Sequence, residues 1–227
     1  MERIWLALLV GCAVLGAHFV TDGAAAPNDS TTAVANAPDV LPAVSTAPPA
    51  PAETLADDAS DPDRAIHDQI LERFAVRHTA LPERERVRLA HAIIREARRH
   101  GLEPDLVMAV IEVESAGYHL AESHVGAMGL MQLLPSTGKE LAGKLEIEWM
   151  GPDTLFDPII NVQLGTAYLR ELADRYDGNV NIALAAYNWG PGRIDRRLRR
   201  GATVPSLYIE QVRRAVDRYA EVPSRRS

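Results

Sequence analysis

Apolar residues recur every three or four positions through most of the chain after residue 61, which is the pattern of amphipathic helices. The first such segment covers residues 62–78 and the second covers residues 81–100. The second segment has Glu83 and Glu85 in its first turn and ends in basic residues before Gly101. This order of charges complements the helix dipole. We expect residues 62–101 to form N-terminal helices that pack on the rest of the domain.

The helical pattern continues toward the C-terminus. An apolar helix is predicted to start at Pro104, a residue that suits the first helical position, and to end before Gly117. Further helices are predicted at residues 136–145, 161–176, 179–188, 193–200 and 205–219, with a loop at residues 146–158. No strand pattern of convincing length is present in the sequence. The fold is therefore predicted to be all-α (mainly α).

Glu114 stands at the far end of the apolar helix that follows Pro104. We expect a carboxylate in this place to be partly desolvated at the rim of a cleft, where burial raises its pKa. A general acid needs a raised pKa of this kind. The segment after it is punctuated by Gly126 and Gly129, so its backbone can approach a ligand closely. This region is the candidate for chemistry.

The first 61 residues have a different pattern. An apolar run at residues 4–20 follows a single Arg and predicts a secretory signal or an N-terminal anchor within residues 1–23. Residues 24–61 are rich in Ala, Pro, Thr, Ser and Asp, which predicts a disordered linker because too little apolar surface is available for burial. We therefore expect an exported protein of the periplasm or cell envelope, with a membrane tether if the N-terminus is retained.

Cys12 is the only cysteine, so an intramolecular disulfide is excluded. The run Leu9-Val10-Gly11-Cys12 is similar to a bacterial lipoprotein cleavage site, which would make Cys12 a lipid attachment point. Apolar residues continue after Cys12, however, whereas a lipoprotein usually turns polar there. A passive apolar residue within a signal is the favoured interpretation of Cys12, and the lipoprotein form remains the alternative.

Charge and histidine spacing restrict the classes of partner. The formal net charge is -7, but residues 21–63 hold eight acids and no Lys or Arg, so the acidity belongs to the linker. Ten arginines lie in residues 193–227 without the basic and aromatic interleaving that is typical of nucleic-acid binding. We expect no nucleic-acid partner. The seven histidines lack a metal-ligand spacing, so no metal and no cofactor is predicted.

Three blocks of residues resemble one known family. They are Glu114-Ser115, then Ser123, Gly126-Ala127-x-Gly129-Leu130-Met131-Gln132, Pro135 and Thr137, and later Ala186-Tyr187-Asn188-x-Gly190. In this order and at this spacing they are similar to the bacterial soluble lytic transglycosylases, the SLT-domain family. Three ordered blocks are more specific than a lone short motif. The resemblance extends over residues 102 to about 219.

The resemblance implies a lysozyme-like helical catalytic domain at residues 102–221. Residues 222–227 are expected to form a frayed tail. It implies a peptidoglycan lytic transglycosylase, which cleaves the β-1,4 bond between N-acetylmuramic acid and N-acetylglucosamine and leaves 1,6-anhydromuramoyl ends. In this family a single Glu acts first as general acid and then as general base. Glu114 matches that position, and the partner is the peptidoglycan glycan strand.

The resemblance also implies four substrate-binding residues, each of which has a structural alternative. Ser123 matches a serine that hydrogen-bonds near the reacting sugar, although a serine there could simply form a turn. Gln132 matches a glutamine that contacts substrate or shapes the cleft, and could equally be a buried amide bonded to backbone. Tyr187 matches a tyrosine close to the acid, and Asn188 follows it as in the family. Without the resemblance, Tyr187 would be read as a core residue.

Two other functions stay open at this stage. One is a muramidase that hydrolyses the same bond, with Glu122 or a positioned water completing the site, since glycosidases normally use two carboxyls. The other is a wall-docking accessory protein of a secretion or pilus apparatus that has no catalytic role. A cell-envelope assembly partner would accompany the second of these.

Overall fold

The computed structural model describes residues 62–77 and 79–220. The expected signal or anchor at residues 1–23, the linker at residues 24–61 and the tail at residues 222–227 lie outside this part of the chain. Across the part that is described, no helix combines the length and the apolar character needed to cross a membrane.

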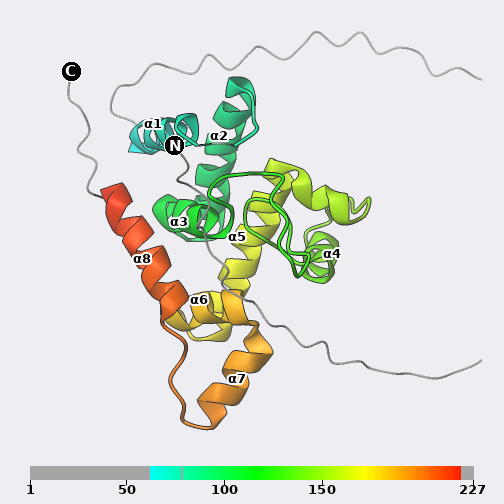
Figure 1. Cartoon of the computed structure of the whole chain (residues 1–227), viewed down its shortest axis with the longest axis vertical. Coiled ribbons are helices and arrows are strands. Elements are labelled where there is room, and N and C mark those ends of the chain that lie inside the picture. The colour runs from blue at the N-terminus through cyan, green and yellow to red at the C-terminus, as the bar shows by residue number, and fades with distance from the viewer. Residues whose placement is uncertain (1–61, 78, 221–227) are drawn as a thin grey trace, which may run out of the picture. The chain divides into compact units, whose positions relative to one another are not determined.

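The described residues fold into helices joined by loops (Figure 1). In chain order these elements are α1 (Pro62–Ala75), α2 (Glu83–Arg99), α3 (Pro104–Ser115), α4 (Pro135–Lys144), the short 3-10 helix η1 (Pro152–Phe156), α5 (Pro158–Arg175), α6 (Val180–Trp189), α7 (Pro191–Arg199) and α8 (Leu207–Ala220). Within the described ranges, β pairing is limited to isolated bridges in the loop between α3 and α4. The predicted all-α class is confirmed.

Most helix boundaries fall within three residues of those predicted. The α5 helix begins at Pro158 rather than at residue 161, because Asp157 acts as its N-cap. Its Oδ1 accepts hydrogen bonds from the amides of Ile159 at 2.8 Å and Ile160 at 2.9 Å. The expected loop at residues 146–158 contains the η1 turn, so that part of the prediction was wrong.

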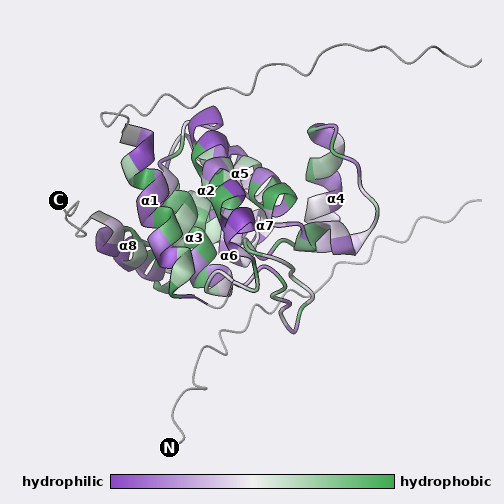
Figure 2. Ribbon diagram, turned by 90° about the horizontal axis from the view of Figure 1, so that it is seen from above, coloured by the Kyte–Doolittle hydropathy of each residue, from purple (hydrophilic) through white to green (hydrophobic). Residues whose placement is uncertain are grey.

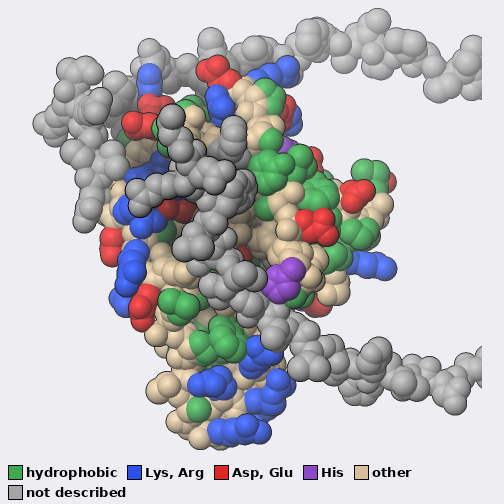
Figure 3. Space-filling model, viewed as in Figure 1, with side chains coloured by type: hydrophobic (Ala, Val, Ile, Leu, Met, Phe, Trp, Pro, Cys, Tyr) green, Lys and Arg blue, Asp and Glu red, His purple; other side chains and the backbone are tan. Residues whose placement is uncertain are grey.

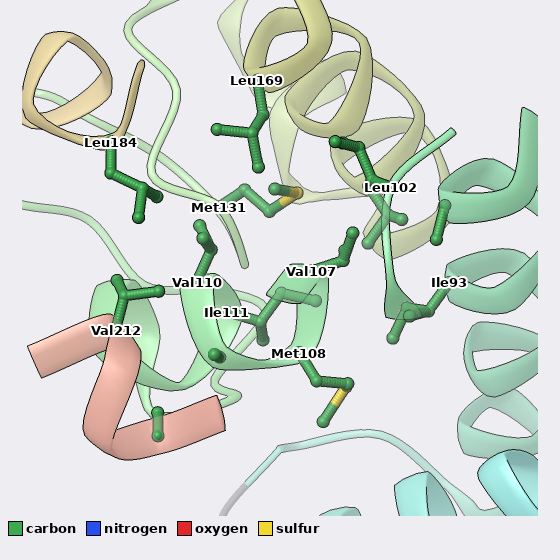
Figure 4. Close-up of a cluster of buried hydrophobic side chains, with 14 of the residues drawn as sticks. Ile93, Leu102, Val107, Met108, Val110, Ile111, Met131, Leu169, Leu184 and Val212 are labelled. Carbon is green, nitrogen blue, oxygen red and sulfur yellow. The ribbon is translucent and has the colours of Figure 1, made fainter. Parts of the chain in front are cut away.

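Helix α3 lies at the centre of the fold, and it is apolar nearly all round. Val107, Met108, Val110 and Ile111 are buried, and α3 packs against α2 and α8. Figure 4 shows Val107 and Val110 on the side of α3 that faces Met131 of the following loop, while Met108 points to the opposite side. Leu184 of α6 and Val212 of α8 belong to the same buried cluster. A helix that is apolar nearly all round is buried, and contacts with several neighbouring elements fix its position. Its C-terminal end, and therefore Glu114, is fixed relative to its neighbours.

A second hydrophobic cluster supports the loop at residues 116–134. Met128 and Leu133 of the loop are buried with Leu141 of α4, Leu155 of η1 and Leu164 of α5. In Figure 2 hydrophobic positions predominate in α3, whereas α8 alternates between hydrophobic and hydrophilic positions. The loop after Glu114 is thus packed between the main core and α4 with η1.

Candidate functional site

Glu114 is a partly buried carboxylate in the last turn of α3. Its Oε1 accepts a hydrogen bond of 2.6 Å from the hydroxyl of Tyr208, which lies in the first turn of α8. Burial raises the pKa of Glu114 to about 7, while the hydrogen bond from Tyr208 opposes this rise because it stabilises the ionised form. Near neutral pH the group can therefore both donate and accept a proton.

The end of α3 is bonded to the loop that follows it. The helix ends at Ser115, and Ala116 caps it in a left-handed conformation with φ 52°. The Ser115 hydroxyl donates to the carbonyl of Leu130 at 2.8 Å and accepts from the amide of Gly117 at 3.2 Å. These bonds keep Glu114 in a constant position relative to residues 116–134.

Asn161 fixes the same loop from the side of α5, and sequence reasoning missed it. It is fully buried, and its Oδ1 accepts from the amide of Met131 at 2.7 Å. Its Nδ2 donates to the carbonyls of Met128 at 3.0 Å and Leu155 at 2.8 Å. One side chain thus satisfies three buried backbone groups. A polar residue in the otherwise apolar buried face of a predicted helix was the signal that could have revealed it.

Gly129 allows Asn161 to approach the loop. A Cβ atom at Gly129 would lie 2.2 Å from Asn161 Nδ2 and 2.2 Å from the Leu155 carbonyl oxygen, and φ is +79°. At Gly126 φ is +76°, but no atom lies within 4 Å of such a Cβ. The close approach expected at these glycines therefore occurs at Gly129, where it serves packing inside the protein.

Ser123 and Gln132 both bond to the backbone of the loop. The Ser123 hydroxyl accepts from the amide of Ala127 at 2.9 Å. The Gln132 Nε2 donates to the carbonyls of Ala121 at 3.1 Å and Gly129 at 3.0 Å, and its own backbone is left-handed with φ 48°. These contacts are the turn-forming and loop-bonding alternatives considered for the two residues. Both side chains remain partly exposed.

Tyr187 approaches the loop from α6. Its hydroxyl donates to the carbonyl of Met131 at 2.8 Å, and its ring lies 5.4 Å from that of Tyr168. Burial, followed by the negative charge of Glu114, raises the pKa of Tyr187 well above its ordinary value. Tyr187 therefore lies within electrostatic range of Glu114 and stays protonated. Asn188 follows it on α6 and is partly buried.

Two other carboxylates occur near Glu114 in the sequence. Glu122 is exposed, and its backbone forms a bridge with Met128. Glu112 pairs with Arg77 at 2.9 Å and Arg218 at 2.5 Å, so its carboxylate is engaged in ion pairs. Among the residues that the structure describes, no group of three His, Cys, Asp or Glu side chains is placed to hold a metal ion.

The sequence model of one protein family, described as the transglycosylase SLT domain, matches residues 91–206. This is just over half of the chain, and it includes Glu114, the loop after it and Tyr187. This chain belongs to the transglycosylase SLT family.

Other SLT-family proteins are similar to parts of this chain. A putative soluble lytic murein transglycosylase of Haemophilus influenzae is 43% identical over 95 residues, which are 42% of this chain and 16% of that protein. The transglycosylase of Enterobacteria phage PRD1 is 41% identical over 113 residues, which are 44% of this chain and 39% of that protein. The chain thus spans well under half the length of each relative.

A solved structure is also similar. It is an inactive mutant of the lytic transglycosylase Slt from Pseudomonas aeruginosa, with a TM-score of 0.48 and 36% identity. The similarity covers 57% of this chain and 22% of that one.

Two features of this SLT-family chain lie outside the matched residues. Tyr208, the hydrogen-bond donor to Glu114, comes just after the match ends at residue 206. Sequence reasoning missed it, because the predicted helix at residues 205–219 carries no motif that points to a site. Helix α1 precedes the match at the other end of the domain.

The arginines of α7 form a basic surface. Figure 3 shows Lys and Arg side chains gathered at the bottom of the view, where α7 lies in Figure 1. Arg193 lies over the ring of Trp189, 5.1 Å from its centroid, and Arg197 Nε donates to the Thr203 carbonyl at 2.9 Å. Arg196, Arg199 and Arg200 are exposed. These side chains form a solvated face of the helix and of the turn after it.

Proposed function

We propose that this chain is a peptidoglycan lytic transglycosylase in which Glu114 is the catalytic acid and base. The observation that carries the proposal is a single partly buried carboxylate with a pKa of about 7, held by a tyrosine hydroxyl in a chain of the SLT family. A carboxyl group with this pKa is protonated in a large fraction of molecules at neutral pH, as the first step requires.

The reaction uses the same carboxyl group twice. Glu114 first protonates the oxygen between N-acetylmuramic acid and N-acetylglucosamine, while the acetamido group of the substrate supports the developing positive charge. The resulting carboxylate then takes the proton from the muramoyl C6 hydroxyl, whose oxygen forms a bond to C1. The product is a 1,6-anhydromuramoyl end, and Glu114 returns to its protonated form without using water.

The loop and α6 supply the proposed contacts with the sugar. Ser123 donates a hydrogen bond from its hydroxyl group to the sugar, because its oxygen already accepts a hydrogen bond from the amide of Ala127. Gln132 shapes the site through its bonds to the loop backbone. Tyr187 supports the loop at Met131 beside Glu114, and Asn188 contacts the glycan. These four roles follow from the positions that the residues share with the family motif.

The proposed place of action is the periplasm or cell envelope, because peptidoglycan lies there. The apolar run at residues 4–20 supports export through a signal peptide or an anchor. Cell fractionation, with metabolic lipid labelling of the protein and of Cys12→Ser, tests this. Label that is lost in the variant would establish a lipoprotein, and a cytoplasmic protein would overturn the localisation.

Mass spectrometry of fragments released from purified peptidoglycan tests the activity. We expect muropeptides lighter by one water than their hydrolysed counterparts, and we expect none from Glu114→Gln. Glu122→Gln is the matched control, because it removes an exposed carboxylate from the same region and should leave the products unchanged. Reducing muramoyl ends that disappear with Glu122→Gln would instead establish a muramidase. An absence of products from the unaltered protein would favour the wall-docking role.

A further inference from the structure

Glu112 lies two residues before Glu114 on α3 and is directed toward α1 and α8. Its Oε1 accepts from Arg218 Nη2 at 2.5 Å and lies 2.9 Å from Arg77 Nη2, while its Oε2 accepts from the Tyr219 hydroxyl at 2.6 Å. The Glu112 side chain is 13% exposed, so both oxygens are held in a largely buried site. Burial acts to raise the pKa of Glu112, but the hydrogen bonds from Tyr219 and Arg218 and the charges of the arginines outweigh it and lower the pKa.

Helix α1 holds the same end of α8 from the other side. The guanidinium group of Arg73 lies over the Tyr219 ring, 4.0 Å from its centroid, and Arg73 Nη2 donates to the carbonyl of Arg218 at 2.7 Å. That carbonyl lies in the last turn of α8, where backbone oxygens lack helical partners. The last turn of α8 is therefore held by Arg73 of α1 and by Glu112 of α3, and Arg77 pairs with Glu112 in turn. We call this set of contacts, made by Arg73, Arg77, Glu112, Arg218 and Tyr219, the α8 clamp.

The opposite end of α8 carries the hydroxyl that bonds to Glu114. Tyr208 precedes Tyr219 by about three helical turns. Between them Val212 and Ala215 are buried in the core, so α8 packs against α3 as one continuous helix. In both Figure 1 and Figure 2 the C-terminal end of α8 reaches α1, and in Figure 1 its N-terminal end lies by α6. The clamp and the Tyr208 hydroxyl thus lie at opposite ends of one helix that packs along α3.

We propose that Glu112 is a positioning residue for catalysis, which through the α8 clamp sets the place of the Tyr208 hydroxyl on Glu114. The proposal rests on the proposed role of Glu114 as acid and base. It gives α1, which lies outside the family match, a part in holding the site together. Glu112 itself does not touch the reacting groups, and its carboxylate is fully engaged by Arg77, Arg218 and Tyr219.

The direction of the shift in the pKa of Glu114 distinguishes a positioning role of Glu112 from a direct effect of its charge. If α8 loosens, the bond from Tyr208 to Glu114 is populated less, the ionised form of Glu114 loses stabilisation, and the pKa of Glu114 rises. Removing the negative charge of Glu112 would by itself lower the pKa of Glu114, since like charges disfavour ionisation. Glu112→Gln therefore gives shifts in opposite directions for the two causes. Tyr219→Phe loosens the clamp without changing the charge of Glu112.

The pH profile of kcat is the first measurement. The alkaline limb reports the loss of the Glu114 proton, so we expect Glu112→Gln and Tyr219→Phe to move it to higher pH by about half a pH unit. We expect kcat to fall about five- to tenfold with KM changed by less than about twofold, because the substrate contacts are intact. Adding Glu112→Gln to Tyr208→Phe should shift the limb no further than Tyr208→Phe alone, since both act through one hydrogen bond.

Asp195→Asn is the matched control. Asp195 is also a carboxylate that binds an arginine and a tyrosine, with Arg175 at 2.5 Å and the Tyr176 hydroxyl at 2.9 Å. Its hydrogen bonds join α7 to the C-terminal end of α5. We expect Asp195→Asn to lower the unfolding temperature without moving the alkaline limb. Equal limb shifts in Asp195→Asn and Glu112→Gln would overturn the proposal.

A second readout does not need activity. The pKa of Glu114 is measured by 13C NMR of the protein labelled at glutamate carboxyl groups, with Glu114→Gln to assign the signal. A higher pKa of Glu114 in Glu112→Gln and in Tyr219→Phe supports the proposal even if the protein releases no anhydro products, in which case the proposed function alone fails. An unchanged or lower pKa in both variants, including variants with reduced stability, would overturn the positioning role of Glu112.

Discussion

The hydroxyl of Tyr208 lies 2.6 Å from Oε1 of Glu114 and joins the first turn of α8 to the last turn of α3. The two residues are 94 positions apart in the sequence. Burial alone would raise the pKa of Glu114 further, and the tyrosine limits that rise to about 7. The proposed acid and base thus depends on a balance between an apolar surrounding and one charge-stabilising hydrogen bond.

Tyr208→Phe should move the alkaline limb of the pH profile upward. A hydrogen bond to a charged group contributes about 1.5–3 kcal/mol, so its loss should raise the pKa of Glu114 by about one to two pH units. We also expect kcat at pH 6 to fall about tenfold, because the hydroxyl orients the carboxyl group. Initial rates of anhydro-product release between pH 5 and 9 measure both effects. An alkaline limb that stays in place would show that Tyr208 does not control the ionisation of Glu114.

Glu114→Gln should stabilise the protein at alkaline pH. The folded pKa of about 7 lies above the ordinary value of 4.5, so the folded state binds more protons than the unfolded state between these values. The free energy of unfolding therefore falls as pH rises from 4.5 to 7, and this penalty remains at higher pH. A glutamine amide avoids it, since it is neutral at every pH.

We expect Glu114→Gln to raise the free energy of unfolding by about 1–3 kcal/mol at pH 8, allowing for the partial exposure of the side chain. The gain should shrink toward zero near pH 4. Urea unfolding at pH 4, 6 and 8 measures this dependence. A gain that is the same at all three pH values would contradict a raised pKa for Glu114.

Local sequence patterns were sufficient to predict the helices. The charges of α2 and the spacing of its apolar residues predict a helix with one exposed face and one buried face. The structure has this helix at Glu83–Arg99, within the predicted residues 81–100. The beginning of α5 was placed too late because the Asp157-Pro158 pair, an N-cap followed by proline, was assigned to a loop. Local signals thus fail mainly where a capping residue is read as part of a turn.

Contacts between distant segments could not be predicted in the same way. The position of Glu114 at the end of a helix could be predicted, because the apolar pattern of α3 stops there. The loop motif comes directly after Glu114 in the chain, so its proximity could be predicted too. Tyr208 and Asn161 reach the same region only because α8 and α5 pack there, which depends on the whole set of helix contacts. Periodicity predicts that α8 is a helix with a buried face, but not which residue of another helix that face meets.

Asn161→Leu should destabilise the fold and disorder the loop after Glu114. The substitution leaves the amide of Met131 and the carbonyl of Leu155 buried without their partner. It also removes one of the two hydrogen bonds to the carbonyl of Met128, which still accepts from the amide of Leu133. Each unsatisfied buried group costs about 1–3 kcal/mol, so we expect a loss of about 3–5 kcal/mol in the free energy of unfolding. Asn181→Leu, at an exposed position of α6, is the control. Guanidinium unfolding of both variants measures the difference, and equal effects would contradict the role of Asn161.

Gly126→Ala and Gly129→Ala form a pair that separates backbone strain from close packing. Both glycines have similar left-handed conformations, with φ of +76° and +79°. A Cβ at Gly126 meets no atom within 4 Å, so Gly126→Ala should cost only the conformational penalty of about 1–2 kcal/mol. A Cβ at Gly129 would overlap Asn161 and the Leu155 carbonyl, so Gly129→Ala should cost at least about 2 kcal/mol more.

Activity should follow the same order in this pair. Gly126→Ala is expected to keep most of the release of anhydro-muropeptides, because the bonds from Asn161 to the loop are undisturbed. Gly129→Ala forces Asn161 away from Met128 and Met131, and the loop beside Glu114 moves with it. Thermal unfolding and product release, measured on both variants, test this together. If Gly129→Ala were no worse than Gly126→Ala in stability and in rate, the Asn161 bonds would not be what holds the loop against Glu114.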